Sequence, residues 1–210
     1  MIKSISYSQK EIILDILLLH CDCGSIDCDP TYSKGNFYKG IKSPTYKFDI
    51  NPKDDKTVKA DCRNLPLEDS SIGVMMFDPP FVISKGPSLS VHKKGTNIIS
   101  ERFSSFESIK ELWQFYEDSL KEFFRVLKEK GILIFKCQDT VSGGKQYLSS
   151  HFIIAKAVET GYYPKDLFVL LAKNRLISGK VKKQQHARKF HSYFLVLQKR
   201  TKTKGVNYGN

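Results

Sequence analysis

The chain is 210 residues long, 40% hydrophobic and 12% aromatic, which suits one folded α/β domain and excludes a disordered protein. Its longest apolar run, residues 12–19, is too short to span a bilayer and no signal peptide precedes it, so we expect a cytoplasmic protein without membrane contact. The formal net charge is +12, and eleven of the 34 basic residues follow Asp166, whereas no acidic residue does.

Helical and extended patterns alternate along the first part of the chain. Residues 9–20 carry apolar side chains at helical spacing, and Ser8 with Glu11 fits a capping box, which predicts a first helix. Extended runs that each end on or near an acidic residue follow at residues 25–30, 45–51, 57–62 and 72–80. Residues 82–105 are polar with glycine and proline, so we expect a long loop there.

The second part of the chain continues this alternation. The patterns predict a helix at 106–128 that stops at Gly131, a strand at 132–138, a helix at 147–161, and strands at 167–173 and 191–199. The last two strands are joined by a basic loop with no helix. This order predicts a mostly parallel sheet of seven strands, with helices on both faces and an antiparallel edge strand.

Acidic residues lie at the ends of four predicted strands: Asp29, Asp49, Asp61 and Asp78. In an open α/β sheet the carboxyl ends of the parallel strands form one edge, where such sheets bind their ligands. Each acid taken singly is more naturally a helix cap or a turn former. As a series they predict a binding site, and carboxylates that share one edge need separate partners because they repel each other.

The sequence contains five cysteines, of which Cys21, Cys23 and Cys28 lie close together. A structural zinc site needs four ligands in paired short spacings, and this cluster does not provide them. We therefore expect reduced thiols, as in the cytoplasm, and no metal.

Two short motifs indicate a function. DPPF at residues 78–81 directly follows an apolar strand, and DPTYSKG at residues 29–35 follows an earlier one. Together they resemble the class I S-adenosylmethionine-dependent methyltransferases, and within them the amino-methyltransferases that act on adenine N6 or cytosine N4 in DNA. That family has Asp, Asn or Ser before Pro-Pro and an aromatic residue, and its cofactor loop often reads Asp-Pro-Phe before a Gly-Ser-Gly turn. Ser33 replaces the first of those glycines, and the resemblance covers roughly residues 25–135 and the final strand pair.

The resemblance implies a Rossmann-like class I methyltransferase domain over residues 1–210 and gives roles to the residues at the sheet edge. The cofactor would be S-adenosylmethionine, with Asp49 at its ribose and Asp61 at its adenine amine. The full set of cofactor-binding residues would be Asp29, Pro30, Thr31, Ser33, Gly35, Asp49, Asp61 and Cys62. The catalytic residues would be Asp78, Pro79, Pro80 and Phe81.

The chemistry of an exocyclic amine explains why a strand would end in this way. Such an amine is a poor nucleophile because its lone pair is delocalised into the ring. Asp78 can accept one amine hydrogen and the carbonyl of Pro79 the other, which favours a tetrahedral nitrogen. The prolines fix the backbone and so preorganise both acceptors, while Phe81 offers a face for an extruded base. A proline-terminated strand with a buried phenylalanine is the structural alternative.

Two segments are predicted to contact nucleic acid. The loop 82–105 leaves the catalytic motif directly, and a basic hairpin at 173–191 would lie beside the site. Cations that would contact phosphates are Lys93, Lys94, Lys182, Lys183, Arg188 and Lys189. A solvated basic surface that adds only non-specific affinity accounts for this charge equally well. His191, at the start of a predicted strand, is assigned a structural or phosphate-contact role.

Three functions fit these features. The favoured one is site-specific methylation of double-stranded DNA, with adenine N6 preferred to cytosine N4 and recognition confined to a small region or shared by a homodimer. The second is methylation of RNA, at guanine N2 or adenine N6 of ribosomal RNA, where a similar DPPF motif occurs. The third is a catalytically inactive nucleic-acid-binding protein that keeps the fold.

Overall fold

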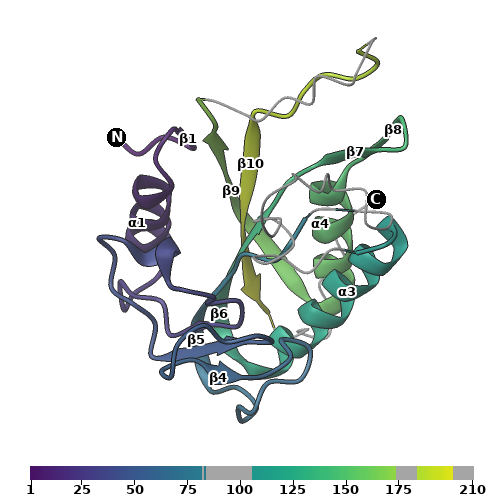
Figure 1. Ribbon diagram of the computed structural model, residues 1–210. Helices are drawn as coiled ribbons and strands as arrows, with labels where there is room; N and C mark the ends of the chain where they lie inside the picture. Colours follow the sequence, from purple (N-terminus) through teal and green to yellow (C-terminus); the bar gives the residue numbers. More distant parts are fainter. Residues whose placement is uncertain (82, 84–105, 174–183, 201–210) are drawn as a thin grey trace, which may run out of the picture.

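The protein folds around one large β-sheet (Figure 1). The structure is a computed structural model and describes residues 1–81, 83, 106–173 and 184–200. Among these residues the main sheet has eight strands in the order β1-β9-β10-β6-β5-β2-β3-β4. Their bounds are Ile5–Ser6 (β1), Cys28–Asp29 (β2), Tyr46–Asp49 (β3), Val58–Lys59 (β4), Ile72–Phe77 (β5), Leu127–Cys137 (β6), Tyr162–Leu171 (β9) and His191–Lys199 (β10).

Each described strand of this sheet is parallel to its neighbours except β10, which is antiparallel to both β6 and β9. The predicted class, a mostly parallel sheet, is therefore confirmed, with two differences in detail. The short strand β1 pairs with Val169 and Leu170 and raises the count from seven to eight. Because β9 folds back outside β10 and is itself covered by β1, the antiparallel strand lies inside the sheet rather than at its edge.

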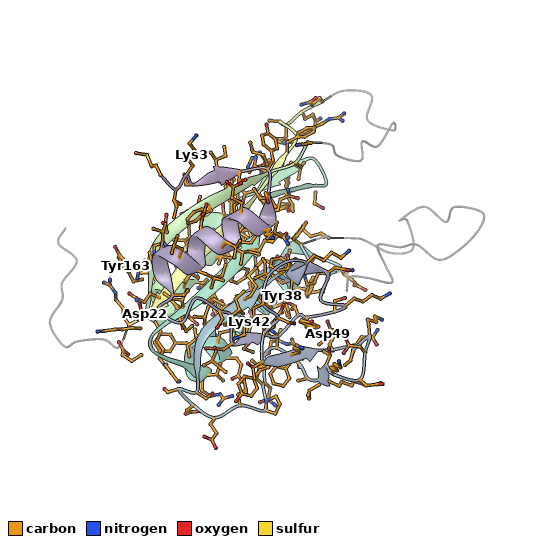
Figure 2. All side chains as sticks on the ribbon, turned by 90° about the vertical axis from the view of Figure 1, so that its left-hand side faces the viewer. Lys3, Asp22, Tyr38, Lys42, Asp49 and Tyr163 are labelled. Carbon is orange, nitrogen blue, oxygen red and sulfur yellow. The ribbon has the colours of Figure 1, made fainter. Side chains whose placement is uncertain are left out.

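Helices cover both faces of the sheet, as predicted. Helix α1 (Gln9–His20) lies on one face, which is turned towards the viewer in Figure 2. Its N-cap is Ser8, whose hydroxyl accepts a hydrogen bond from the Glu11 N–H. Helices α3 (Ile109–Val126) and α4 (Ser149–Thr160) pack together on the other face (Figure 1). A short 3₁₀ helix, η1 (Asn36–Tyr38), follows β2. None of the helices in the described ranges is long and apolar enough to cross a membrane.

Alternation along the central strands divides the core in two. In β6, Leu133 and Phe135 pack towards α3 and α4, whereas Ile132 and Ile134 pack towards α1. Successive side chains of a strand point to opposite faces, so this pattern follows directly from the backbone. The same parity places the next even residue, Lys136, on the α1 face, among buried apolar neighbours.

The predicted helix at 106–128 ends earlier than its pattern suggests. Val126 is its last residue, and Leu127 already pairs with Ile72 as the first residue of β6. The register then shifts before Val74, so Gly131 lies in an irregular part of the strand and does not stop the helix. A Cβ at Gly131 would lie 2.8 Å from the Lys128 carbonyl oxygen, which explains the glycine by close approach instead.

A small hairpin, β7 (Thr140–Ser142) with β8 (Lys145–Tyr147), was not predicted. Its turn is formed by Gly143 and Gly144, both with positive φ. Two adjacent glycines are a known signal for such a two-residue turn, so the sequence did contain the information.

Candidate active site

The four acids predicted to share a sheet edge do so. Asp29 and Asp49 end β2 and β3, Asp61 follows β4, and Asp78 follows β5. These four strands are adjacent and parallel, so along the edge the acids follow one another in the order Asp78, Asp29, Asp49 and Asp61. The end of β6, with Lys136, comes next beyond Asp78.

Each acid has its own partner, as the repulsion between neighbouring carboxylates requires. Asp29 accepts hydrogen bonds from Thr31 and Tyr38; the carboxylate of Asp49 accepts the N–H groups of Ser33 and Asn51; that of Asp61 binds the guanidinium of Arg63; and Asp78 pairs with the ammonium of Lys136. Each of the four carboxyl groups is therefore stabilised by hydrogen-bond donors or a cation of its own. Hydrogen bonds from Arg63 lower the pKa of Asp61 below its ordinary value.

Asp29 is the most deeply buried of the four, with 2% of its surface exposed. Its Oδ1 accepts the N–H of Thr31 at 2.7 Å and the Thr31 hydroxyl at 3.1 Å, and its Oδ2 accepts the Tyr38 hydroxyl at 2.7 Å. Burial raises the pKa of Asp29 to about 7, although these hydrogen bonds oppose the shift. Asp29 therefore stabilises the loop after β2 through these hydrogen bonds, and it does not line the cavity described next.

The burial of Asp29 predicts a stability that depends on pH. The carboxyl pKa is ordinarily 3.8 and rises to about 7 on folding, so its contribution is fully present below about pH 4 and is lost as the pH rises through about 7. Between about pH 5.5 and about pH 8, we expect the free energy of unfolding to fall by about 2 kcal/mol more in the wild type than in Asp29→Asn. Urea denaturation at the two pH values measures this difference, and equal pH dependence in both proteins would contradict it.

The loop after β2 keeps a glycine-like backbone despite its few glycines. Ser33 has φ of 52° and Gly35 has φ of 64°, so both lie in the left-handed region. The N–H of Ser33 donates to Asp49 Oδ2 at 2.9 Å, which ties this loop to the end of β3. Ser33 thus takes the conformation that a glycine would have at this position, and its backbone N–H makes the contact with Asp49.

Gly35 has no room for a side chain. A Cβ there would lie 2.6 Å from Tyr32 Cζ, and that ring stacks on Tyr38, the residue that binds Asp29. We expect Gly35→Ala to destabilise the protein by about 2–3 kcal/mol and to weaken cofactor binding about tenfold or more, through strain and the displaced ring. The matched control is Gly24→Ala, because Gly24 has φ of 59° and nothing within 4 Å of its Cβ position. Calorimetric titration should show unchanged affinity in the control; equal loss in both variants would refute the role of the ring.

A cavity of about 240 Å³ lies above this edge of the sheet. Eight of the twelve residues predicted to be catalytic or to bind the cofactor line it: Pro30, Thr31, Ser33, Asp49, Asp61, Cys62, Asp78 and Pro80. Its remaining walls are Ile50, Arg63, Phe106 and Phe115. The cavity thus combines carboxylate acceptors with apolar and aromatic surface. Asp29, Gly35, Pro79 and Phe81 are not among the lining residues.

The DPPF motif at 78–81 is held by two hydroxyls, those of Thr31 and Tyr116. The N–H of Asp78 donates to Thr31 Oγ1 at 3.1 Å, and that same hydroxyl donates to Asp29. The hydroxyl of Tyr116, a fully buried residue of α3, donates to the Pro80 carbonyl at 3.1 Å. None of the described residues donates to the Pro79 carbonyl, the acceptor assigned to the amine.

Phe81 lines a second cavity, of about 450 Å³, on the other side of the motif. Its polar walls include Lys136, Gln138 and His191, and Tyr7 also lines it. His191 bonds to the Tyr193 hydroxyl at 2.9 Å, and its structural or phosphate-contact role stays a prediction. The four-residue motif therefore lies between two cavities, with Asp78 and Pro80 facing one and Phe81 facing the other.

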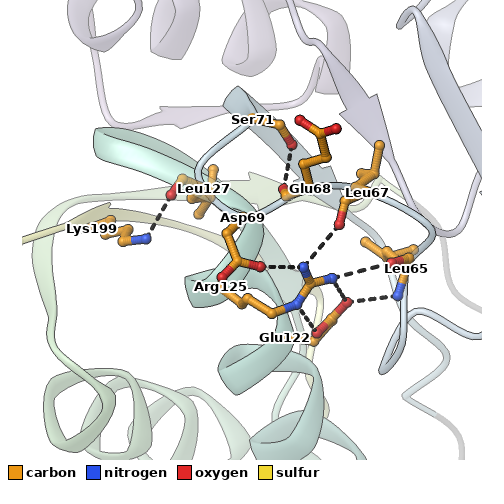
Figure 3. A network of polar contacts seen from close by, with 9 residues as sticks. All are labelled: Leu65, Leu67, Glu68, Asp69, Ser71, Glu122, Arg125, Leu127 and Lys199. Carbon is orange, nitrogen blue, oxygen red and sulfur yellow. Dashed lines mark hydrogen bonds and ion pairs between the residues drawn. The ribbon is translucent and has the colours of Figure 1, made fainter.

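The segment that carries Asp61 and Cys62 is fastened to α3 by Arg125 (Figure 3). The guanidinium donates to the carbonyls of Leu65 and Leu67, to Asp69, and through two nitrogens to the carboxylate of Glu122. Glu122 in turn accepts the N–H of Leu65 at 2.7 Å. This network fixes the connection between β4 and β5, so it sets one wall of the first cavity from a distance.

Sequence reasoning missed, among others, the site residues Arg63, Phe115, Tyr116 and Lys136. The last three reach the site from α3 or β6, far along the chain. A signal did exist for Lys136, because a lysine inside the apolar run ILIFKC is expected to have a buried partner. For Arg63 the signal was its position two residues after Asp61, from which it binds that carboxylate.

The predicted nucleic-acid contacts are described only in part. Arg188 is exposed and Lys189 is half-buried. Outside the described residues lie the loop 82–105 apart from residue 83, most of the hairpin at 173–191, and the cations Lys93, Lys94, Lys182 and Lys183.

The five cysteines are free thiols. Burial raises the pKa of Cys62 to about 12, so this thiol is neutral at the cavity wall. In the described part of the chain, no group of His, Cys, Asp and Glu side chains could hold a metal ion.

Comparisons with known proteins find the fold. No family model matches the sequence, and no curated protein matches it. The crystal structure of the [4+2]-cyclase SpnF has a TM-score of 0.52 at 12% identity, over 90% of this chain and 80% of that chain. The cytosine-N4-specific PvuII DNA methyltransferase has a TM-score of 0.48 at 17% identity, over 76% of this chain and 52% of that chain.

A protein of Thermus thermophilus described as a DNA modification methylase, in complex with S-adenosyl-L-methionine, has a TM-score of 0.43 at 13% identity, over 71% of this chain. The chain spans little more than half of that methylase, 57% of its length. The strand order described above and the likeness to solved structures show that this chain has the Rossmann-like methyltransferase fold. At such identities they show the fold alone.

Proposed function

We propose that this chain transfers a methyl group from S-adenosylmethionine to an exocyclic amine of a nucleic-acid base, with adenine N6 of double-stranded DNA favoured over cytosine N4. The observation that carries the proposal is the placement of the DPPF motif between two cavities, one with carboxylates and one with Phe81. A methyl donor and an acceptor base have to meet at one point from two sides, and Asp78 lies at such a point. The resemblance to amino-methyltransferases rests on the same residues.

The first cavity suits S-adenosylmethionine by its donor and acceptor set. Asp49 would accept hydrogen bonds from the ribose hydroxyls, and each of its oxygens has a second lone pair beyond its present contact. Asp61 would accept the adenine amine by exchanging part of its contact with Arg63, which now donates twice to each of its oxygens. Ile50 and Phe115 offer apolar walls for a purine ring. When bound, the cofactor would supply an electrophilic methyl group on its sulfonium.

The second cavity suits the acceptor base. Phe81 would stack against the extruded base, a contact worth about 1–3 kcal/mol per base. Asp78 and the Pro79 carbonyl would accept the two amine hydrogens, and Tyr116 keeps the adjacent Pro80 carbonyl in place. Catalysis would thus rest on positioning and on preorganised acceptors, and the amine proton would leave to water after transfer.

Methyl transfer to DNA and to RNA in parallel tests this proposal. Purified protein is incubated with labelled S-adenosylmethionine and unmethylated duplex DNA or RNA, and the nucleosides are identified by mass spectrometry. Methylated adenine in DNA is the expected result. Methylated cytosine in DNA would correct the base, and a methylated nucleoside in RNA alone would replace the substrate. Label in neither, with cofactor binding also absent, would point to a catalytically inactive nucleic-acid-binding protein.

A further inference from the structure

Lys136 occupies an unusual position for a lysine. It lies next to the carboxyl end of β6, and its side chain is only 12% exposed, on the face covered by α1. Its Nζ lies 3.1 Å from Asp78 Oδ2 and 3.0 Å from Gln9 Oε1. The same ammonium lies over the rings of Phe37 and Phe194, at 5.1 Å and 5.8 Å from their centroids. The ammonium of this flexible side chain thus contacts four groups, the side chains of Asp78, Gln9, Phe37 and Phe194.

Stability is a poor explanation for this arrangement. Burying a lysine and a carboxylate costs desolvation free energy that their attraction often only offsets, and apolar residues of similar size commonly stabilise a fold as well or better. The neighbours at the same face of β6, Ile132 and Ile134, are apolar. We infer that Lys136 is a positioning residue, which holds the carboxylate of Asp78 in the orientation that methyl transfer needs.

The contacts of Asp78 show how this would work. Its Oδ2 is held by Lys136 and its N–H by the Thr31 hydroxyl, whereas its Oδ1 accepts no hydrogen bond from the described residues. The side chain is 24% exposed and lines the first cavity. Of the two carboxylate oxygens, Oδ2 is therefore held in place by Lys136, whereas Oδ1 is left to accept a substrate hydrogen.

Gln9 extends this role to α1. It is the first residue of that helix, and its side-chain oxygen accepts a hydrogen bond from Lys136. Since Lys136 also lines the cavity that contains Phe81, the anchor lies at the border of the proposed base site. The catalytic consequence rests on the proposed function, but the anchoring of Asp78 does not.

Steady-state kinetics of Lys136→Met test the catalytic consequence. Methionine keeps the length and removes the charge, so we expect kcat to fall about 100-fold, as displacement of a reacting group by about 1 Å can do, while the Kd for S-adenosylmethionine changes by less than about threefold. Lys136→Arg should recover at least about tenfold of that loss. Lys128→Met, an exposed lysine at the start of the same strand, should keep kcat within about twofold. A kcat within about threefold for Lys136→Met, or equal losses in kcat and cofactor affinity, would overturn the inference.

Unfolding of a double variant tests the anchoring without any assay of activity. Urea midpoints are measured for Lys136→Met, Asp78→Ala and the two combined. If the two residues are coupled, the double variant should be no less stable than the less stable of the two single variants, because the second change removes a partner already lost. Midpoint shifts that simply add would refute the anchoring. Absence of methyl transfer in the wild type would instead refute the proposed function, and the unfolding result would still decide the role of Lys136.

Discussion

Methyl transfer by Asp78→Ala is expected to fall by at least about 1000-fold, while the affinity for S-adenosylmethionine stays within about threefold of the wild type. The substitution removes the only carboxylate of the DPPF motif, and Asp78 lines the first cavity. The other acids of that cavity, Asp49 and Asp61, belong to different strands and keep their own partners. Transfer is measured with labelled cofactor in single-turnover assays, and affinity by calorimetric titration. Parallel loss of both would mean that Asp78 has a structural role.

The Asp78→Asn variant gives a sharper version of this result. The side-chain oxygen of an asparagine can accept an amine hydrogen, and the amino-methyltransferases that this sequence resembles have Asn at this position in some members. Here the ammonium of Lys136 is an obligatory donor, so it would bind the amide oxygen and turn the NH₂ group towards the substrate, where a donor meets a donor. We therefore expect Asp78→Asn to be about as inactive as Asp78→Ala.

Removal of Lys136 should partly restore the asparagine variant. In Lys136→Met/Asp78→Asn the amide can rotate, and transfer should be at least about tenfold faster than in Asp78→Asn alone. The Lys128→Met/Asp78→Asn variant is the matched control and should show no recovery. Recovery in both double variants would assign the effect to net charge, and not to the direction of the amide.

Arg125→Met is expected to lower the free energy of unfolding by about 3 kcal/mol. Five hydrogen bonds of the guanidinium would be lost, and the carboxylate of Glu122, which is 10% exposed, would keep its charge without a cation. The connection that carries Asp61 would loosen, so the Kd for S-adenosylmethionine should rise about tenfold. Urea denaturation and calorimetric titration at a temperature well below unfolding measure the two effects.

Two variants define the meaning of this result. Arg125→Lys keeps the charge but offers three donors on a single atom, so it should restore less than half of the lost stability. Lys121→Met removes an exposed ion pair with Glu117 on the same helix and should cost no more than about 0.5 kcal/mol. If Arg125→Met were no worse than Lys121→Met, the network in Figure 3 would not hold the loop.

The part of the site that the sequence predicted comes from short segments in chain order. Asp29, Asp49, Asp61 and Asp78 each follow a strand, and a parallel sheet brings such positions to one edge by geometry alone. Strand existence and order therefore sufficed, although strands such as Val58–Lys59 proved much shorter than their patterns. The bounds of α1 and β10 agree with the prediction because apolar spacing and a cap define them.

The part that sequence did not predict depends on contacts between distant segments. Lys136 meets Asp78 across 58 positions, and Tyr116 meets Pro80 across 36. No local pattern specifies which side chains of β6 or α3 reach the motif, because this depends on register and on the end of α3. Gly131 shows the limit: it was read as a helix stop, yet it serves a close approach inside a strand.

The direction of β10 has a consequence for the basic segment at the end of the chain. His191, its first residue, pairs with Leu171 at the carboxyl end of β9, whereas Lys199 pairs with Tyr162 at the opposite end. Arg188 and Lys189 precede β10 and so lie towards the edge that carries the DPPF motif. One antiparallel strand thus distributes a charge that is continuous in sequence over two ends of the molecule.

Among the basic residues after Asp166, the two described ones at the far end, Lys199 and Arg200, already make contacts within the protein. Lys199 donates to the Leu127 carbonyl at 2.7 Å, and the guanidinium of Arg200 lies 3.6 Å from the centre of the Tyr163 ring. A nucleic acid bound across the site would have its phosphates neutralised only by the cations at the same end of the molecule as the site, so only these would release counterions. The logarithm of its binding constant falls with the logarithm of salt concentration by about 0.9 per phosphate neutralised on duplex DNA. That slope should therefore report fewer phosphates than the eleven basic residues after Asp166 suggest.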